Sequence, residues 1–172
     1  VIRLLKPYFS IGDNMKEKII NIAKEIVPYI LVILLAILIR TFIASPVRVN
    51  GSSMHATLKE GDILLLNKID KNYKRFDIVV INNNGTKLIK RIIGLPGENV
   101  EYKNNSLYIN NKYVKDVSKE VTGDFSLEDL YGYKMIPKGY YFVMGDNRDG
   151  SSDSRDLRIG LIKKSDIKGK AK

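Results

Sequence analysis

The most apolar part of the sequence is IVPYILVILLAILIRTFIA, residues 26–44, and it restricts what the chain can fold into more than any other segment. A helix that spans a membrane needs about 20 mostly apolar residues. The run reaches that length if Arg40 lies near one end, where a long side chain can extend to the headgroups. Pro28 stands near the start, where the first helical turn tolerates proline. We therefore expect a single transmembrane anchor over residues 26–44.

Two other interpretations of this segment stay open. A buried core helix would suit the uninterrupted apolar stretch from Ile30 to Ile39, which is short. A cleaved signal peptide fits less well, because no clean small-x-small site follows Ile39. If the segment is an anchor, the positive-inside rule favours a cytoplasmic N-terminal segment, residues 1–25, and a plasma-membrane protein whose remaining chain lies on the extracytoplasmic face. The basic residues that carry this orientation are Arg3, Lys6, Lys16, Lys18 and Lys24.

Composition excludes several kinds of site. The chain has no cysteine, which removes disulfides, thiol catalysis and thiolate zinc sites. It has one histidine, so metal sites of the HExxH type are also excluded, and we expect no metal and no cofactor. The formal net charge of +10 is compatible with two partners, nucleic acid and an anionic lipid membrane.

From Ser45 onward the pattern changes to short apolar or alternating runs separated by Gly, Asn, Asp and Pro, which predicts strands joined by turns. The runs are DILLLNKI, FDIVVIN, KLIKRIIGL, SLYINNKYV and GYYFVMGD. GLPG fits a type II turn with Pro96 and Gly97 at its centre, and SLEDLYGY predicts a short helical turn opened by Ser126. The final KKSDIKGKAK has the composition of a frayed, solvated basic tail.

The segment VNGSSMHATLKEGD, residues 49–62, places two serines beside His55. Ser53 and His55 would share a face of an extended segment, but a catalytic base must meet the hydroxyl and be oriented by a third group. No acidic residue in the immediate segment could orient the ring. An exposed loop histidine is therefore the simpler interpretation of His55.

In LIKRIIGLPGE, residues 88–98, a strand would place Lys90 between Leu88 and Ile92 on one face. Burial disfavours the charged form of a lysine, which lowers its pKa and makes it a usable base. Arg91 could not serve, since a guanidinium does not deprotonate in proteins. A lysine that reaches solvent from a sheet edge would explain the same pattern.

The stretch MGDNRDGSSDSRDLRIG, residues 144–160, follows an apolar run and is dense in Asp, Asn, Arg, Ser and Gly. It lacks the spacing of an EF-hand calcium loop. A plain polar turn would have this composition. Alternatively, Asp153 and Arg155 could pair across one face while a serine hydroxyl holds a lysine amine.

Together, and in this order after an apolar run, four stretches resemble the type I signal peptidases, the bacterial leader peptidase family in its short Gram-positive-like form. They are RTFIASPVRVNGSSMHATLKEGD, FDIVVIN, LIKRIIGLPGE and GYYFVMGDNRDGSSDSRDLRIG. The resemblance implies a membrane-anchored serine endopeptidase with a Ser-Lys dyad, which removes signal peptides from exported preproteins after small-x-small sites.

The resemblance also implies the fold and the site. The fold would be mainly β: a transmembrane helix, then an antiparallel β-sheet peptidase domain formed by residues 45–97 and 137–172, with residues 98–136 as a small inserted cap. Ser53 would be the nucleophile and Lys90 the general base. The supporting residues would be Ser151, which orients the lysine, Asp153 and Arg155, which form a salt bridge, and Asp146, Asn147 and Arg148 as scaffold. Shallow apolar pockets for small substrate residues would be lined by Val47, Val49, Met54, Leu58, Leu88 and Ile89.

The chain departs from the family pattern at two positions. Gly51 stands where some members carry a hydroxyl that helps bind the oxyanion, and Ala56 stands where the family usually has proline. These departures keep open a membrane-tethered assembly or chaperone factor, for instance in pilus assembly, that binds without cutting. A soluble nucleic-acid binder is a further alternative, but the sequence has no helix-turn-helix or aromatic-basic motif. We expect signal peptides and a lipid membrane, and no nucleic acid, as partners.

Overall fold

The computed structural model describes residues 11–172, and the side chains from Met15 onward. The predicted cytoplasmic segment therefore lies partly outside the described residues, at positions 1–10. The chain separates after Thr41 into an N-terminal helical unit and a β domain, Phe42–Lys172, and each is described by itself.

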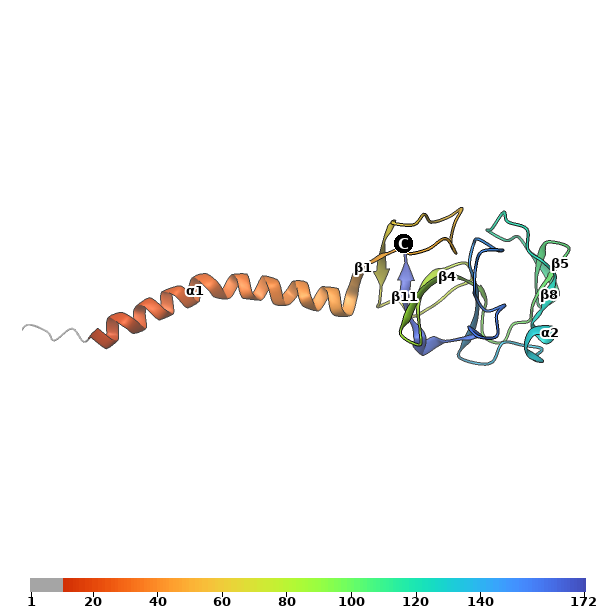
Figure 1. Ribbon diagram of the computed structural model, residues 1–172. Helices are drawn as coiled ribbons and strands as arrows, with labels where there is room; N and C mark the ends of the chain where they lie inside the picture. Colours follow the sequence, from red (N-terminus) through yellow and green to blue (C-terminus); the bar gives the residue numbers. More distant parts are fainter. Residues whose placement is uncertain (1–10) are drawn as a thin grey trace, which may run out of the picture. The chain divides into compact units, whose positions relative to one another are not determined.

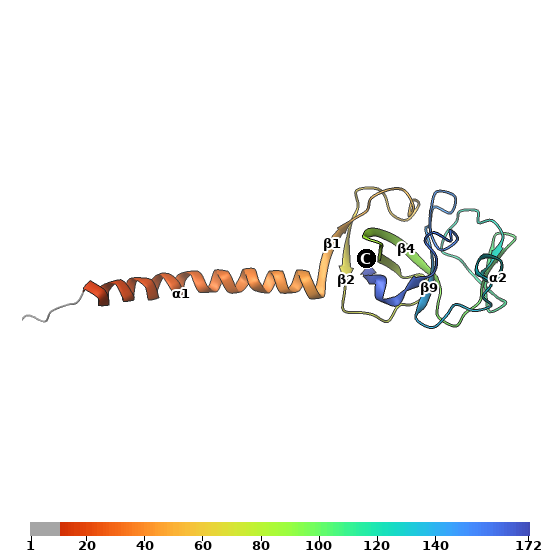
Figure 2. The ribbon, with the colours of Figure 1, turned by 60° about the horizontal axis from the view of Figure 1, so that its bottom comes forward.

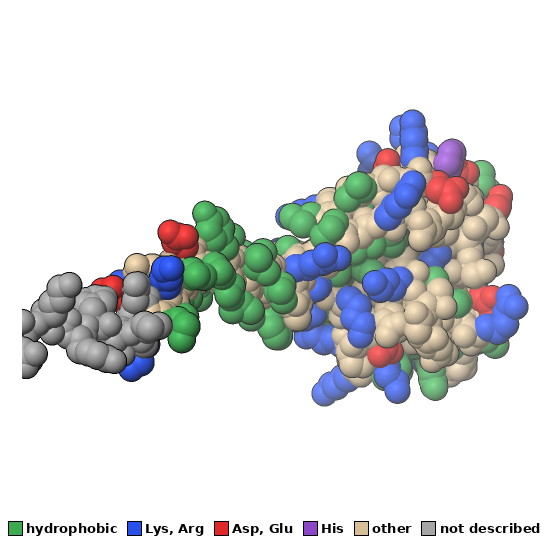
Figure 3. Space-filling view, turned by 60° about the vertical axis from the view of Figure 1, so that its left-hand side comes forward, with side chains coloured by type: hydrophobic (Ala, Val, Ile, Leu, Met, Phe, Trp, Pro, Cys, Tyr) green, Lys and Arg blue, Asp and Glu red, His purple; other side chains and the backbone are tan. Residues whose placement is uncertain are grey.

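The helix α1, Ile11–Leu38, continues into a π-helical turn at Ile39–Ile43. Its apolar side chains are exposed and cover much of its surface (Figure 3). Among the described residues, α1 with its π turn is the one helix long and apolar enough to cross a membrane. This exposure does not fit a buried core helix, since a core helix would hide its apolar side chains.

The helix begins earlier than the apolar run predicts. Pro28 consequently lies inside α1 and not in its first turn. The residues before it, MKEKIINIAKE from Met15 to Glu25, are mostly good helix formers, so the helix extends through them although they are too polar for a membrane interior.

Within residues 11–172, the larger sheet has seven antiparallel strands, in the order β1-β2-β11-β3-β4-β9-β10. Strands β1, β4 and β11 of this sheet are labelled in Figure 1, and β2 and β9 in Figure 2. The bounds are β1 Ala44–Arg48, β2 Ile63–Asn67, β3 Ile78–Asn83, β4 Thr86–Gly94, β9 Tyr140–Met144, β10 Ile162–Lys163 and β11 Ile167–Ala171. Four of the five runs predicted as strands form β2, β3, β4 and β9, and the fifth, SLYINNKYV, forms a hairpin of the second sheet. The predicted turn at GLPG also forms: the Glu98 N–H donates to the Leu95 carbonyl at 3.2 Å, and Gly97 has φ +82°.

The prediction of a frayed basic tail is wrong. Residues 162–171 form β10, a 3-10 turn at Lys164–Asp166, and β11, which lies between β2 and β3 in the sheet. Figure 2 shows the C-terminus beside β2, and the Lys172 N–H donates to the Leu65 carbonyl of that strand at 3.1 Å. Ile167 is 2% exposed, and the Lys170 ammonium pairs with Asp70 at 2.8 Å and Asp77 at 3.0 Å. Two carboxylates from another part of the chain thus allow a lysine to occupy a central strand.

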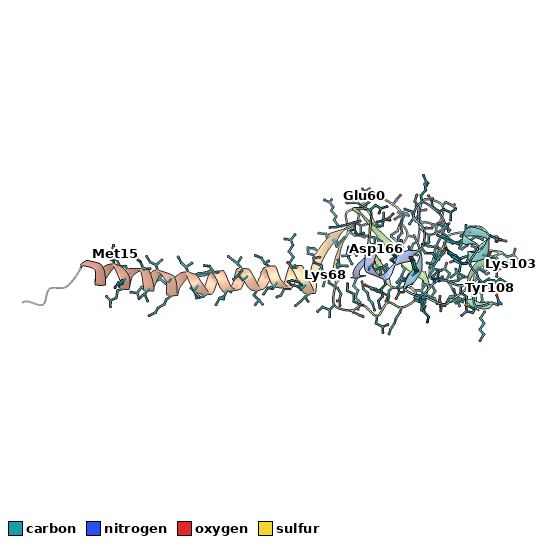
Figure 4. The ribbon with its side chains drawn as sticks, turned by 90° about the horizontal axis from the view of Figure 1, so that it is seen from below. Met15, Glu60, Lys68, Lys103, Tyr108 and Asp166 are labelled. Atoms are coloured by element: carbon teal, nitrogen blue, oxygen red, sulfur yellow. The ribbon has the colours of Figure 1, made fainter. Side chains whose placement is uncertain are left out.

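The second sheet has four antiparallel strands, in the order β7-β6-β5-β8, within the described residues. Its strands are β5 Val100–Lys103, β6 Ser106–Ile109, β7 Lys112–Val114 and β8 Phe125–Ser126. Helix α2, Leu127–Tyr131, follows, and Ser126 Oγ accepts a hydrogen bond from the Asp129 N–H at 3.0 Å, so the predicted helical turn is confirmed with its cap. Lys103 and Tyr108 mark this sheet at the end of the β domain opposite Lys68 (Figure 4).

Paired asparagines explain the tight hairpins of this region. Asn104 and Asn105 have φ of 50° and 58°, and Asn110 and Asn111 have φ of 51° and 62°. Two-residue hairpin turns of type I′ require positive φ at both central positions, which asparagine tolerates better than most residues.

One of the hydrophobic clusters contains residues of both sheets. Val100, Tyr102 and Leu107 of the smaller sheet pack in the same buried cluster as Phe142 and Met144 of β9. Residues 98–136, the range predicted to form an inserted cap, contain the smaller sheet. Through this cluster the smaller sheet packs against β9, the strand that leads into the polar segment after Met144.

Candidate active site

Ser53 lies in a turn that two buried side chains hold in place. Val49, just after β1, is 2% exposed, and its N–H donates to the Asp62 carbonyl at 2.8 Å. Met54 is 1% exposed, and its carbonyl accepts from the Leu58 N–H at 2.8 Å. Ser53 itself is half-buried. The buried side chains of Val49, four residues before Ser53, and of Met54, directly after it, therefore restrain the backbone at Ser53.

The segment after β9 contacts the backbone of this turn. The Asn147 N–H donates to the Ser53 carbonyl at 3.1 Å, and Asn147 Nδ2 donates to the Ser52 carbonyl at 3.2 Å. Gly145 approaches even more closely: a Cβ at this position would lie 2.4 Å from the Ser53 carbonyl oxygen and 2.2 Å from Ser151 Oγ. Only glycine fits here, because the Ser53 carbonyl oxygen and Ser151 Oγ both pack against its Cα.

Lys90 lies on β4 and is 3% exposed. Its ammonium donates to Ser151 Oγ at 2.9 Å. Burial lowers the pKa of Lys90; the carboxylate of Asp153 opposes the shift and the charge of Arg155 adds to it. Within the described residues, the hydrogen bond of Lys90 goes to Ser151 and none joins it to Ser53. Catalytic hydrogen bonds of free enzymes are often looser than in the substrate complex.

Asp153 and Arg155 form a two-pronged salt bridge beside this lysine, with Nε–Oδ1 and Nη2–Oδ2 distances of 2.9 Å. Asp153 is fully buried and also accepts the Gly145 N–H at 2.9 Å. Burial acts to raise the pKa of Asp153, but the hydrogen bonds and charge of Arg155, with the bond from Gly145, outweigh it and lower the pKa overall. Asp153 therefore remains a carboxylate, which fixes both Arg155 and the Gly145 backbone.

Arg91, the residue after Lys90, ties β4 to the same polar segment. It is bound through two nitrogens to Asp146, at 2.8 and 2.6 Å, and its Nη1 donates to the Phe76 carbonyl at 2.8 Å. The sequence argument excluded Arg91 as a base but did not predict this structural role. The only sequence signal for this role was the acidic residue in GDNR, Asp146, but nothing in the sequence indicated that it pairs with Arg91.

A cleft of about 270 Å³ opens beside Ser53, between β1 and the first half of β4. Strand β1 pairs with β2 alone among the described strands, and β4 pairs with β9 only from Arg91 onward. The backbone edges that face this cleft are therefore unpaired in the described structure. The cleft is lined by Pro46, Val47, Arg48, Val49, Asn50, Gly51, Ser53, Met54, Lys87, Leu88 and Ile89.

Leu58 differs from the other residues predicted to line the pockets. It is absent from the cleft wall and packs on the cluster formed by Leu64, Leu66 and Val80. The reason is local: the turn that places Met54 at the cleft directs the chain back toward the core by Leu58.

The two positions that depart from the family pattern both have left-handed backbone. Gly51 has φ +85° with open space around it, and Ala56 has φ +79°. Proline cannot adopt a positive φ, so this turn has a conformation that the usual proline would exclude. His55 is exposed, and its backbone N–H donates to the Ser52 carbonyl at 2.9 Å.

A family model described as "Signal peptidase, peptidase S26" matches residues 19–172. Signal peptidase I V of Bacillus subtilis is 45% identical over 151 residues, which are 80% of this chain and 89% of that protein. A signal peptidase I of Bacillus amyloliquefaciens is 44% identical over 161 residues, covering 83% of this chain and 79% of the relative.

Among solved structures, the crystal structure of a signal peptidase I from Enterococcus faecalis matches with a TM-score of 0.53 and 41% identity. The match covers 58% of this chain and 96% of that one. The relatives carry the name of a cleaving enzyme, which disfavours the assembly-factor alternative. The chain therefore belongs to the signal peptidase family, peptidase S26, and is a membrane-anchored serine endopeptidase that removes signal peptides.

Proposed function

We propose that Ser53 is the nucleophile and Lys90 the general base of this peptidase. The observation that supports the proposal most strongly is the environment of Lys90. Its amine is buried, has a lowered pKa, and is held by Ser151, whose hydroxyl approaches the same glycine as the Ser53 carbonyl. A buried lysine loses its proton more readily, and the neutral amine can accept the proton of a serine hydroxyl.

In the first half of the reaction Lys90 takes the Ser53 proton while Oγ bonds to the scissile carbonyl carbon. The resulting oxyanion needs preorganised donors, and the Ser53 backbone N–H is one. The C–N bond then breaks, the leaving amine receives the proton from Lys90, and the mature chain departs. In the second half Lys90 takes a proton from water, the hydroxide opens the acyl ester, and Ser53 recovers its proton.

The substrate is an extended segment of an exported preprotein, and we place it between the unpaired edges of β1 and β4. Main-chain hydrogen bonds to an open strand edge provide affinity without a demand on sequence. The cleft wall is mixed, and its apolar part is formed by Val47, Val49, Met54, Leu88 and Ile89. A small apolar cleft accepts alanine beside the scissile bond and excludes larger side chains sterically.

The β domain acts on the extracytoplasmic face of the plasma membrane, with the N-terminus of α1 in the cytoplasm. Basic residues before the apolar run support this orientation. The chain has no cysteine, so single cysteines introduced as Met15→Cys and Lys103→Cys report one side each. In intact cells, a maleimide that cannot cross membranes should label position 103 and not position 15. The opposite labelling would overturn the orientation.

The dyad is tested by cleavage of a preprotein with a small-x-small site by the full chain in detergent or vesicles. Ser53→Ala and Lys90→Ala should both abolish product, and Lys90→Arg should be equally inactive because it retains the charge but cannot deprotonate. The matched controls are Ser52→Ala, an exposed neighbouring hydroxyl, and Lys103→Ala, an exposed lysine of β5. Activity that survives in Lys90→Ala or Lys90→Arg would rule out Lys90 as the base.

A further inference from the structure

Arg148 is a fully buried cation in the segment that follows β9. Its side chain has no exposed surface, and Nη1 donates to Tyr102 Oη at 2.6 Å and, more distantly, to Thr122 Oγ1 at 3.4 Å. Its Nε and Nη2 have no hydrogen-bond partner in the described structure, so the charge on Nη2 depends on an ion pair. Its guanidinium carbon lies 5.5 Å from the centre of the Tyr102 ring. A buried guanidinium needs a counter-charge, since desolvation of an unpaired ion is costly.

Asp116 supplies that charge from the loop between β7 and β8. Its Oδ2 lies 2.8 Å from Arg148 Nη2 and also accepts the hydroxyl of Tyr102. Its other oxygen accepts the N–H groups of Val117 and Ser118, at 2.7 and 3.3 Å. One carboxylate therefore both shapes this loop and pairs with the buried arginine.

The same loop makes a second contact with the polar segment. Ser118 Oγ donates to the Asp146 carbonyl at 3.1 Å. Asp146 and Arg148 flank Asn147, whose backbone N–H and side chain hold the carbonyls of Ser53 and Ser52. Asp116 and Ser118 thus contact the polar segment at Arg148 and Asp146, on both sides of Asn147. Asn147 in turn binds the turn that carries Ser53.

From Arg148 the contacts continue to the base. The Arg148 carbonyl accepts Arg155 Nη2 at 2.6 Å, and Arg155 is fixed in turn by Asp153. Asp153 and Arg155 are the charged groups that act on Lys90, and Ser151 is its hydrogen-bond partner. A shift of the Arg148 backbone would move Arg155 relative to Lys90 and Asn147 relative to Ser53.

We propose that Asp116, which lies outside the sequence motifs of the site, is a positioning residue for cleavage: by pairing with Arg148 it holds the segment that aligns Ser53 with Lys90. This inference rests on the proposed dyad. The smaller sheet and its loops therefore contribute to the active site, because Asp116 supplies the negative charge that pairs with Arg148 in the polar segment after β9.

The test compares Asp116→Asn with Asp124→Asn in the full chain. Asp124 is a control from the same cap, because its carboxylate accepts one backbone N–H, from Asn104, and forms no ion pair with the segment after β9. For Asp116→Asn we expect kcat to fall between roughly tenfold and a hundredfold with KM little changed, as for a small misalignment of reacting groups. The acid limb of the pH–rate profile should also move to higher pH, because Arg155 would no longer help to keep Lys90 neutral. Asp124→Asn should retain wild-type kcat and profile.

A second variant separates positioning from folding. Tyr102→Phe removes the hydroxyl that bridges Asp116 and Arg148 but keeps both charges, so it should show the same changes to a smaller extent. If Asp116→Asn does not fold, the kcat and pH profile of Tyr102→Phe alone test whether Asp116 has a positioning role. The inference is overturned if kcat falls only in proportion to the unfolded fraction, with an unmoved pH profile, or if both variants behave as wild type. The dyad is judged separately: a wild-type chain that cleaves and a Lys90→Ala chain that does not would leave it standing in either case.

Discussion

Gly145 offers a sharp test of how the candidate site is assembled, because its backbone separates the two serines. In Gly145→Ala the new Cβ would lie 2.2 Å from Ser151 Oγ and 2.4 Å from the Ser53 carbonyl oxygen. Real Cβ atoms essentially never approach a neighbour to less than 3.0 Å. Ser151 Oγ must therefore retreat by about 0.8 Å and Ser53 O by about 0.6 Å, unless the segment itself moves.

These displacements set the size of the expected effect. The Ser53 carbonyl belongs to the proposed nucleophile, and Ser151 Oγ accepts a hydrogen bond from the amine of Lys90, the proposed base. Misplacing reacting groups by about 1 Å can lower a rate by about a hundredfold, so we expect kcat/KM to fall between roughly tenfold and a hundredfold. Overpacking should also lower the free energy of unfolding, by about 1–3 kcal/mol.

The assay is preprotein cleavage at saturating and limiting substrate, together with thermal unfolding of the same samples. Gly123→Ala is the matched control, because it adds the same methyl group at a glycine with ordinary φ and no neighbour within 4 Å. The folded fraction measured at the assay temperature corrects the rate for lost stability. A corrected kcat/KM for Gly145→Ala within about twofold of wild type would refute the argument that this contact positions the reacting groups.

Three further predictions follow from other parts of the β domain. Because burial lowers the pKa of Lys90 and a base must be neutral, kcat/KM should rise with pH through that lowered pKa and then level off; a flat profile would contradict a lysine base. Ile167→Ala should lower the free energy of unfolding by about 2–5 kcal/mol in denaturant titrations, whereas Lys168→Ala, at the exposed neighbouring position, should change it by less than about 0.5 kcal/mol. Ala56→Gly should raise thermal stability by relieving a positive φ that costs about 1 kcal/mol, and Ala56→Pro should lower it; equal melting temperatures for all three chains would show that the turn is not strained.

Local patterns predicted the β domain well where one strand face is apolar. The alternation in DILLLNKI corresponds to β2, whose residues are alternately exposed and buried. The same reasoning failed at KGKAK, where lysines occupy a strand inside the sheet. That strand depends on Asp70 and Asp77, about a hundred residues earlier in the chain, and on close contact between Gly169 and the Asn67 carbonyl. No property of the tail itself reveals those partners.

The same distinction holds at the site. Ser53, Lys90, Ser151, Asp153 and Arg155 were predicted from the resemblance of their motifs to the type I signal peptidases, whereas the composition of each stretch alone also fits a polar turn or a sheet-edge lysine. Arg91 could be excluded as a base on its chemistry alone, but its bond to Asp146 depends on how β4 meets the segment after β9. Asp116 stands in an ordinary polar stretch, and only the packing of its loop against Arg148 gives it significance.

The sequence by itself determined the elements and the chemistry available: an apolar helix long enough for a membrane, strands with alternating burial, and a serine, a lysine and polar segments able to support them. These follow from periodicity and side-chain type, which are local. The tertiary structure decided that the last residues form an internal strand, that two serines meet at Gly145, and that a cap loop balances a buried cation behind the site. Those outcomes depend on contacts between distant segments, since burial and charge compensation are set by the neighbours that folding brings together.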